Sequence, residues 1–332
     1  MRRTLAVLIG LGLFLPAVPA AGRTYRWVDQ NGNVRYSDQP PRSENVAPPP
    51  ATPTPGAIRT PRHPVHPAAD ELLELSGLKQ QMKAISLDAR EHVHQNLGHL
   101  EPRDLKGVAA ATAQTLDPDR VYASILDEFG RSVDDTKIAD VRLWYRSPLG
   151  RTITEIEVAS VVSERRRELT AFVAEWRVKP PAPTRVALTQ RLDAATGATE
   201  MSVDLIVGIA QAVVRVADPH LPPDRRLKPG QLEAQARQIR LSTLEVFRQN
   251  NTVAMLYIYR NVADQDLARY IQFLESEAGA WYGNAVRRSV VYALAAAVER
   301  TATDLVRVVP PHRWGGPGAF KKPALPAEDK RL

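Results

Sequence analysis

Apolar residues recur at helical spacing along most of this chain. The first stripe has spacings of three, three and four positions and is formed by Leu72, Leu75, Leu78 and Met82. Such a stripe predicts one amphipathic helix that begins near position 68. Further stripes predict helices at 88–98, 103–115, 118–130, 135–146, 148–177, 185–196, 199–217, 230–248, 250–261, 264–275 and 277–309. Since no strand is expected after position 45, the predicted fold class is mainly α, a helical bundle.

The helices form two sets that resemble each other at an offset of 129 positions. A proline-containing break at 179–183 separates a first repeat, 69–178, from a second repeat, 184–309. The matched pairs are Asp135 with Asp264, Trp144 with Phe273, Ser147 with Ser276, and Gly150 with Gly279. The sequence therefore predicts two divergent repeats.

Each repeat contains a junction between two helices. Asp135 and Asp264 are expected to cap the start of one helix, since a carboxylate accepts hydrogen bonds from free N–H groups there. Ser147 is expected to cap the next helix with Pro148 at its first position, where a missing N–H costs nothing. A glycine in the first turn, Gly150 or Gly279, would let another helix approach closely.

The first junction carries a recognisable element. It reads W-Y-x-S-P-x-G and consists of Trp144, Tyr145, Ser147, Pro148 and Gly150. This element resembles an exported all-helical bacterial family of unknown function. The resemblance implies a helical bundle and brings no catalytic residues. The second junction departs from the element, with Leu274 and Glu277 at the positions of the second aromatic residue and the proline.

The segment YRWVDQNGNVRYSDQPP, residues 25–41, predicts a β-hairpin. Asn31-Gly32 suits a two-residue type I′ turn, and that turn would place Trp27 directly opposite Tyr36. A lone hairpin is marginal in water, so its aromatic face needs a cover. The residues Tyr25, Trp27 and Tyr36 are therefore either a small hydrophobic core or a candidate partner-binding surface. The segment resembles an N-terminal module of unknown function that many exported Gram-negative proteins carry.

The residues before and after this hairpin predict export and modular organisation. Two arginines followed by the apolar run Leu5–Leu15 are typical of a signal peptide, 1–21, with cleavage near Ala20 or Ala21. We expect a hairpin module at 22–45, a proline-rich linker at 46–68 and a disordered tail at 310–332. No later segment is apolar enough for a transmembrane anchor, so we expect a periplasmic or secreted protein.

Composition narrows the chemistry. With no cysteine in 332 residues, disulfides, thiol nucleophiles and cysteine-based metal sites are excluded. The net charge of +7 permits contact with anionic envelope components. No cluster of lysine and arginine is typical of nucleic-acid binding, so no nucleic-acid partner is expected.

Few residues qualify for catalysis or metal binding. The histidines His92, His94 and His99 lack the i, i+4 spacing of zinc-binding helices. Four carboxylates qualify as a general acid or base, and these are Glu155, Glu157, Glu275 and Glu277. Capping, helix-dipole and solvation roles account for all of these residues, so no catalytic residue, cofactor or metal is expected.

Three functions are compatible with these features. The favoured hypothesis is an exported, non-enzymatic envelope protein that binds a protein or a cell-wall component. The first alternative is an accessory or hydrolytic enzyme that acts on envelope glycans, with glutamates in a cleft between the repeats. The second alternative is a helical container for an apolar ligand.

Overall fold

The computed structural model describes residues 25–28, 34–37, 67–96, 101–161, 165–176, 179–221 and 223–309. The described part of the chain is mainly helical, as predicted. Its α-helices are α2 (Pro67–Leu75), α3 (Leu78–Asn96), α4 (Pro102–Thr115), α5 (Pro118–Gly130), α6 (Asp135–Arg146), α7 (Pro148–Ser160), α8 (Arg165–Glu175), α9 (Pro183–Thr196), α10 (Ala198–Ala217), α11 (Gln231–Ile258), α12 (Asp264–Glu275) and α13 (Glu277–Val308). Two 3-10 turns, η2 (Asp218–His220) and η3 (Pro223–Arg225), lie between α10 and α11.

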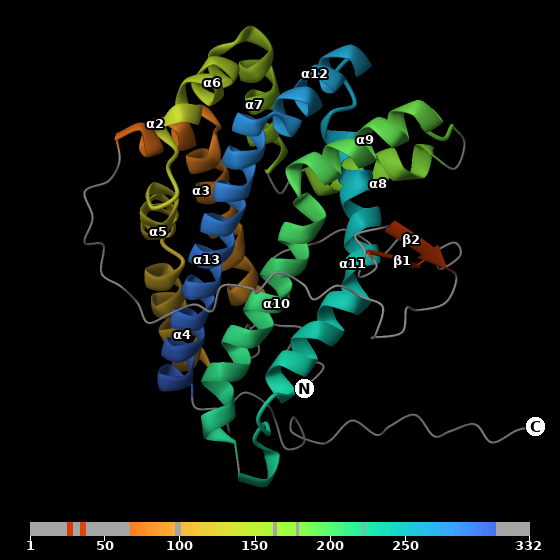
Figure 1. Ribbon diagram of the computed structural model, residues 1–332. Coiled ribbons are helices and arrows are strands. Elements are labelled where there is room, and N and C mark those ends of the chain that lie inside the picture. The colour runs from red at the N-terminus through yellow and green to blue at the C-terminus, as the bar shows by residue number, and fades with distance from the viewer. Residues whose placement is uncertain are drawn as a thin grey trace, which may run out of the picture. The chain divides into compact units, whose positions relative to one another are not determined.

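The 32-residue helix α13 is the centre of the packing. It contacts α4 and α5 on one side and α10 on the other (Figure 1). Small buried side chains such as Ala293 and Ala297 let its neighbours approach closely. Its buried hydroxyls are satisfied, because Ser289 and Thr301 donate to carbonyls of their own helix at 2.8 Å. Burial along most of its length explains why this helix is so long.

Two larger hydrophobic clusters form the core. The first joins α2, α3, α5 and α6 to α13 and includes Leu72, Ile125 and Phe129. The second joins α7, α9, α11 and α12 and includes Ile153 and Leu267. Each cluster therefore contains helices from both predicted repeats.

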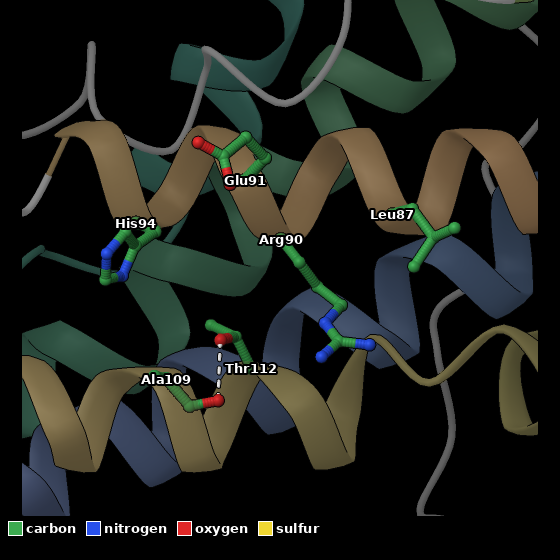
Figure 2. A pocket seen from close by; sticks show the side chains of 6 residues that line it. All are labelled: Leu87, Arg90, Glu91, His94, Ala109 and Thr112. Atoms are coloured by element: carbon green, nitrogen blue, oxygen red, sulfur yellow. Dashed lines mark hydrogen bonds between the residues drawn. The ribbon is translucent and has the colours of Figure 1, made fainter.

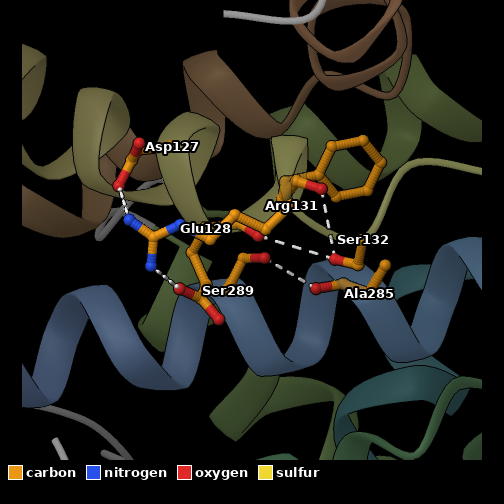
Figure 3. A network of polar contacts seen from close by, with 7 residues as sticks. Asp127, Glu128, Arg131, Ser132, Ala285 and Ser289 are labelled. Carbon is orange, nitrogen blue, oxygen red and sulfur yellow. Dashed lines mark hydrogen bonds and ion pairs between the residues drawn. The ribbon is translucent and has the colours of Figure 1, made fainter. Parts of the chain in front are cut away.

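A small polar network forms at the end of α5, beside α13 (Figure 3). Arg131 pairs with Asp127 at 2.5 Å and with Glu128 at 3.0 Å. The Ser132 hydroxyl donates to the Phe129 carbonyl at 3.1 Å. The indole N–H of Trp281 on α13 then donates to the Ser132 carbonyl at 3.0 Å, which anchors this turn to the central helix.

The first predicted helix is two helices. Its apolar stripe is buried as expected, but α2 ends at Leu75 and α3 begins at Leu78. The break lies at Gly77, whose φ of +72° is strained for residues with a side chain. A Cβ at this position would lie 2.4 Å from the Val158 side chain on α7, so the glycine also permits a close approach.

Three further helix boundaries differ from the predictions. The helix predicted at 88–98 is the second half of α3, which begins at Leu78. The segment 148–177 is not one helix, because α7 ends at Ser160 and a separate α8 packs on α11 through Leu169. The two helices predicted at 230–248 and 250–261 are one continuous helix, α11. The Asn251 side chain, which favours a break by itself, instead donates to Thr199 at 3.3 Å and Ser202 at 3.4 Å on α10.

The strands β1 (Tyr25–Val28) and β2 (Val34–Ser37) pair antiparallel. The register places Arg35 opposite Trp27 and Arg26 opposite Tyr36, so the predicted direct opposition of Trp27 and Tyr36 is wrong. The turn itself lies outside the described residues.

Several predicted segments lie outside the described residues, namely the signal peptide, most of the linker and the tail at 310–332. Among the helices that the structure does describe, none combines the length and the apolar character that crossing a membrane requires.

Candidate functional site

The two predicted junctions have the same local geometry. Ser147 ends α6 and starts α7, and its hydroxyl accepts a hydrogen bond from the Gly150 N–H at 2.9 Å. Ser276 does the same between α12 and α13, accepting from the Gly279 N–H at 3.1 Å. Pro148 occupies the first position of α7, as expected.

The junction glycines are required by the helix that precedes them. A Cβ at Gly150 would lie 2.1 Å from the Trp144 carbonyl oxygen, and a Cβ at Gly279 would lie 2.0 Å from the Phe273 carbonyl oxygen. The close approach is therefore to the end of the chain's own previous helix, and the expectation of a separate neighbouring helix is corrected. Both positions exclude any side chain.

Neither predicted aspartate caps its helix. Asp134 caps α6, with its side chain accepting from the Thr136 N–H at 3.1 Å, while Asp135 is the first helical residue. The residue before α12 is Ala263, and the Asp264 carboxylate pairs with Arg185 of α9 at 2.5 Å. The acidic start of each helix is real, but its partners differ.

The aromatic residues of the two junctions meet. The rings of Trp144 and Phe273 stack with centroids 4.6 Å apart and an interplanar angle of 7°. Tyr145 contacts Phe273 edge-on at 6.0 Å, and Tyr270 also stacks on Trp144, with centroids 5.6 Å apart. Trp144 and Phe273 pack against both hydrophobic clusters, so this stack joins them.

A carboxyl group lies beside this stack. Oε1 of Glu157 on α7 accepts hydrogen bonds from the hydroxyls of Tyr259 at 2.6 Å and Tyr270 at 2.8 Å. Burial raises the pKa of the Glu157 carboxyl, and the two phenols offset only part of that effect. Burial and the neighbouring carboxylate raise the pKa of both tyrosines well above the usual value. Glu157 therefore keeps its proton to a higher pH than a carboxyl group exposed to water does.

The other candidate carboxylates serve elsewhere. Glu275 accepts two hydrogen bonds from the Arg191 guanidinium, one of them at 2.7 Å from Nε, and this contact lowers the pKa of Glu275. Glu277 pairs with Lys137 at 3.0 Å, and Glu155 is exposed on α7. Among the four candidates that the sequence offered equally, Glu157 is thus the one whose pKa burial raises. Its tyrosine partners lie more than a hundred residues away, so no local sequence signal could have found them.

An open groove runs between α3 and α4 (Figure 2). It has a volume of about 280 Å³ and is lined by Leu87, Arg90, Glu91, His94, Ala109 and Thr112. Arg90 and His94, one helical turn apart, project from α3 toward α4, whereas Glu91 points away. No ion pair or side-chain hydrogen bond joins Arg90 to another of the described residues.

The histidines do not form a metal site in the described part of the chain. His94 lines the groove, His99 lies outside the described residues, and His92 contacts other groups. Among the described residues, no group of three or more potential ligands converges. The side chains of Tyr25, Trp27 and Tyr36 also lie outside the description, so the predicted partner-binding surface stays a prediction.

Comparison with known families assigns one part of the chain. Residues 11–64 match a family described as a domain of unknown function, DUF4124. This segment contains the hairpin sequence, and the match supports the predicted N-terminal module of unknown function. No curated protein and no solved structure matches the chain significantly.

Proposed function

We propose that this protein is exported and binds a protein or cell-wall partner in the periplasm or outside the cell, without catalysing a reaction. The signal-like sequence at 1–21 supports export. The N-terminal match to a domain of unknown function is compatible with a modular binding protein and assigns no reaction.

The observation that carries this proposal is the groove between α3 and α4. It combines a cation, Arg90, that has no ion-pair partner among the described residues with Leu87, whose exposed fraction is 47%. Ligand sites combine apolar side chains with a few polar groups that fix the ligand's orientation, and Leu87 and Arg90 supply one of each.

The hydrolytic alternative has less support. A glycosidase needs two carboxyl groups that flank one bond. Here Glu275 is bound to Arg191, Glu277 is bound to Lys137, and Glu157 is bound to two tyrosines. Each therefore has a structural partner that accounts for its position.

The container alternative also has less support. An apolar ligand requires an enclosed apolar cavity. The groove between α3 and α4 is open, and its lining includes Arg90, Glu91 and His94. This lining suits a polar or charged group.

The modular organisation belongs to the same proposal. We propose that residues 22–45 fold as a hairpin module that adds a second contact to the partner through Tyr25, Trp27 and Tyr36. The helical sets at 69–178 and 184–309 are proposed to be divergent copies of one unit. The likeness of their junctions supports this, and the W-Y-x-S-P-x-G element supports a relationship to an exported helical family.

The test is capture of a partner from envelope extract with the mature protein. Three proteins are compared, namely the unaltered chain, a Trp27→Ala/Tyr36→Ala variant and an Arg90→Gln variant. A partner that the unaltered chain retains and either variant loses supports the proposal and assigns the contact. If purified chain instead releases fragments from isolated envelope glycans and all three proteins retain nothing, the enzymatic alternative replaces it.

A further inference from the structure

The groove between α3 and α4 has features that select a class of ligand. Arg90 and His94 are separated by four positions on α3, a spacing that places both side chains on one face. Figure 2 shows both directed toward α4. Two nitrogen-bearing side chains on one wall, one of them a fixed cation, favour an anionic group between them.

The opposite wall leaves room for that group. Ala109 contributes only a methyl group, and the Thr112 hydroxyl is already used, donating to the carbonyls of Val108 at 2.9 Å and Ala109 at 3.2 Å. The α4 wall therefore offers space with little competition for the anion. Specific binding must come from the α3 wall.

The size and charge of the groove restrict the ligand further. A volume of about 280 Å³ holds a group the size of one amino-acid residue. A planar guanidinium matches a carboxylate through two parallel hydrogen bonds. Glu91 follows Arg90 on α3, and its negative charge, although directed away from α4, disfavours a dianion such as a phosphate monoester.

Leu87 adds an apolar requirement. It lies three positions before Arg90 on the same wall, and 47% of the side chain is exposed. A ligand that satisfies both residues carries a carboxylate and an aliphatic group a few bonds apart. The last residue of a peptide has this arrangement when its side chain is aliphatic, because the carboxylate and the side chain share one Cα atom.

We propose that this groove binds the free C-terminal carboxylate of a peptide that ends in an aliphatic residue. The inference rests on the proposed binding function and specifies the partner's contact group. Arg90 holds the carboxylate, His94 donates or accepts a further hydrogen bond, and Leu87 contacts the terminal side chain.

The experiment is a calorimetric titration of the mature protein with three probes. These are an N-acetylated tetrapeptide ending in leucine with a free carboxylate, the same peptide with a C-terminal amide, and N-acetyl-leucine. We expect the acid to bind about tenfold to a hundredfold more tightly than the amide, because the amide cannot pair with Arg90. Equal affinity of acid and amide, or binding of neither, overturns the inference. Comparable binding of N-acetyl-leucine and the acid overturns the peptide assignment and leaves a small carboxylate as the ligand.

Variants locate the binding. Arg90→Gln is expected to abolish the preference for the acid, and Arg90→Lys is expected to retain part of it. Arg103→Gln provides the matched control, since Arg103 is an exposed arginine of α4 outside the groove lining. Circular dichroism checks that each variant is folded. A His94→Gln variant tests the contribution of the second nitrogen-bearing side chain on the α3 wall. An equal loss in Arg103→Gln would overturn the assignment.

Peptide binding and capture from envelope extract together distinguish a wrong ligand for the groove from a wrong function for the protein. If no peptide binds but the unaltered chain still captures a partner from envelope extract that a hairpin variant loses, only the groove assignment is wrong. If neither peptide nor envelope partner binds, the proposed function is wrong as well.

Discussion

The two helix junctions of this protein share a local design and differ in the helix that each one starts. Both end one helix at a serine, start the next with that serine as the cap, and require glycine in the first turn. After the first junction, α7 has 13 residues, of which Gly150 and Ile153 are buried. After the second, α13 has 32 residues with buried positions along its length. The junction sets where a helix starts, and burial sets how far it runs.

Each helix that starts at a junction packs with helices of the other predicted repeat. Ile153 of α7 belongs to the hydrophobic cluster of α12, whereas α13 packs in the cluster of α2, α3, α5 and α6. The charges that hold the preceding helices are reversed. Glu71 of α2 binds Arg142 of α6, whereas Arg191 of α9 binds Glu275 of α12. The same local unit is thus built into two different environments.

The largest expected effect tests whether the two glycines are equivalent. Gly279→Ala places a Cβ about 2 Å from a backbone oxygen and should lower the free energy of unfolding by roughly 3 kcal/mol, with a similar loss for Gly150→Ala. Urea unfolding measures both. The control is Gly283→Ala on α13, where nothing lies within 4 Å of the added Cβ; it should gain about 0.5–1 kcal/mol. If Gly279→Ala changed the free energy of unfolding no differently from Gly283→Ala, the steric account would be refuted.

The next effect tests the contact between the junctions. Trp144→Ala should cost about 2 kcal/mol, since the ring is large but only partly buried. A double-mutant cycle with Phe273→Ala should give a coupling energy of about 0.5–1.5 kcal/mol. Trp144→Phe keeps a stacked ring and removes the buried indole N–H, for which no acceptor is found within the described structure, so it should lose less.

An exposed neighbour provides the control for this cycle. Leu143→Ala removes a side chain that is 72% exposed and should change stability by less than about 0.5 kcal/mol. Additive losses for Trp144→Ala and Phe273→Ala would show that the ring stack does not couple the junctions.

A smaller effect compares the serine caps. Ser147→Ala and Ser276→Ala each remove an acceptor for a first-turn N–H and should each cost about 1 kcal/mol. Ser147→Asp keeps an acceptor and should retain most of the stability. Thermal unfolding separates these variants. An unchanged melting temperature in both alanine variants would mean that the caps are dispensable.

The smallest change concerns Glu157, which has no counterpart in the second junction, where Val286 stands at the matching position. Because burial raises the pKa of this carboxyl in the folded state, the folded protein binds the proton more tightly than the unfolded chain. That contribution to stability is present below the usual pKa of 4.5 and is lost as pH rises through the folded pKa. Glu157→Gln cannot ionise and should not show this loss.

The measurement is unfolding of both proteins between pH 4 and pH 8. We expect the variant to gain in stability relative to the unaltered protein as pH rises above 4.5. Glu155→Gln is the control, since Glu155 is exposed on the same helix, and it should show no such trend. A constant difference between Glu157→Gln and the unaltered protein at every pH would show that Glu157 does not titrate in this range.

Most helix starts could be predicted from local signals. The periodic pattern and the Ser-Pro pair of residues 147–148 correctly predicted α6, and the bounds of α12 also agree with the prediction. The break at Gly77 was missed although Ser-Gly pairs are typical of turns. The continuity of α11 was missed because Asn250 and Asn251 favour turns by themselves, and Asn251 has its hydrogen-bond partners on α10.

In the candidate site, too, the sequence identified single residues but not the contacts between helices. The sequence named Trp144, Tyr145 and Phe273 but could not show that two of these rings stack on each other. It named Glu157 without its two tyrosines, and His94 without Arg90 or Leu87. In each case the missing partner lies on another helix or does not stand out in composition.

The sequence by itself determined the mainly helical class, the positions of most helix starts and the absence of thiol chemistry, because caps, prolines, glycines and apolar spacing act within a few residues. Only the tertiary structure decided which helices are long, which repeat contributes to which hydrophobic cluster, and which carboxyl group is perturbed. These properties depend on burial and on contacts between distant segments. A single pattern along the chain does not encode them, since free energy from burial depends on the neighbour that covers each residue.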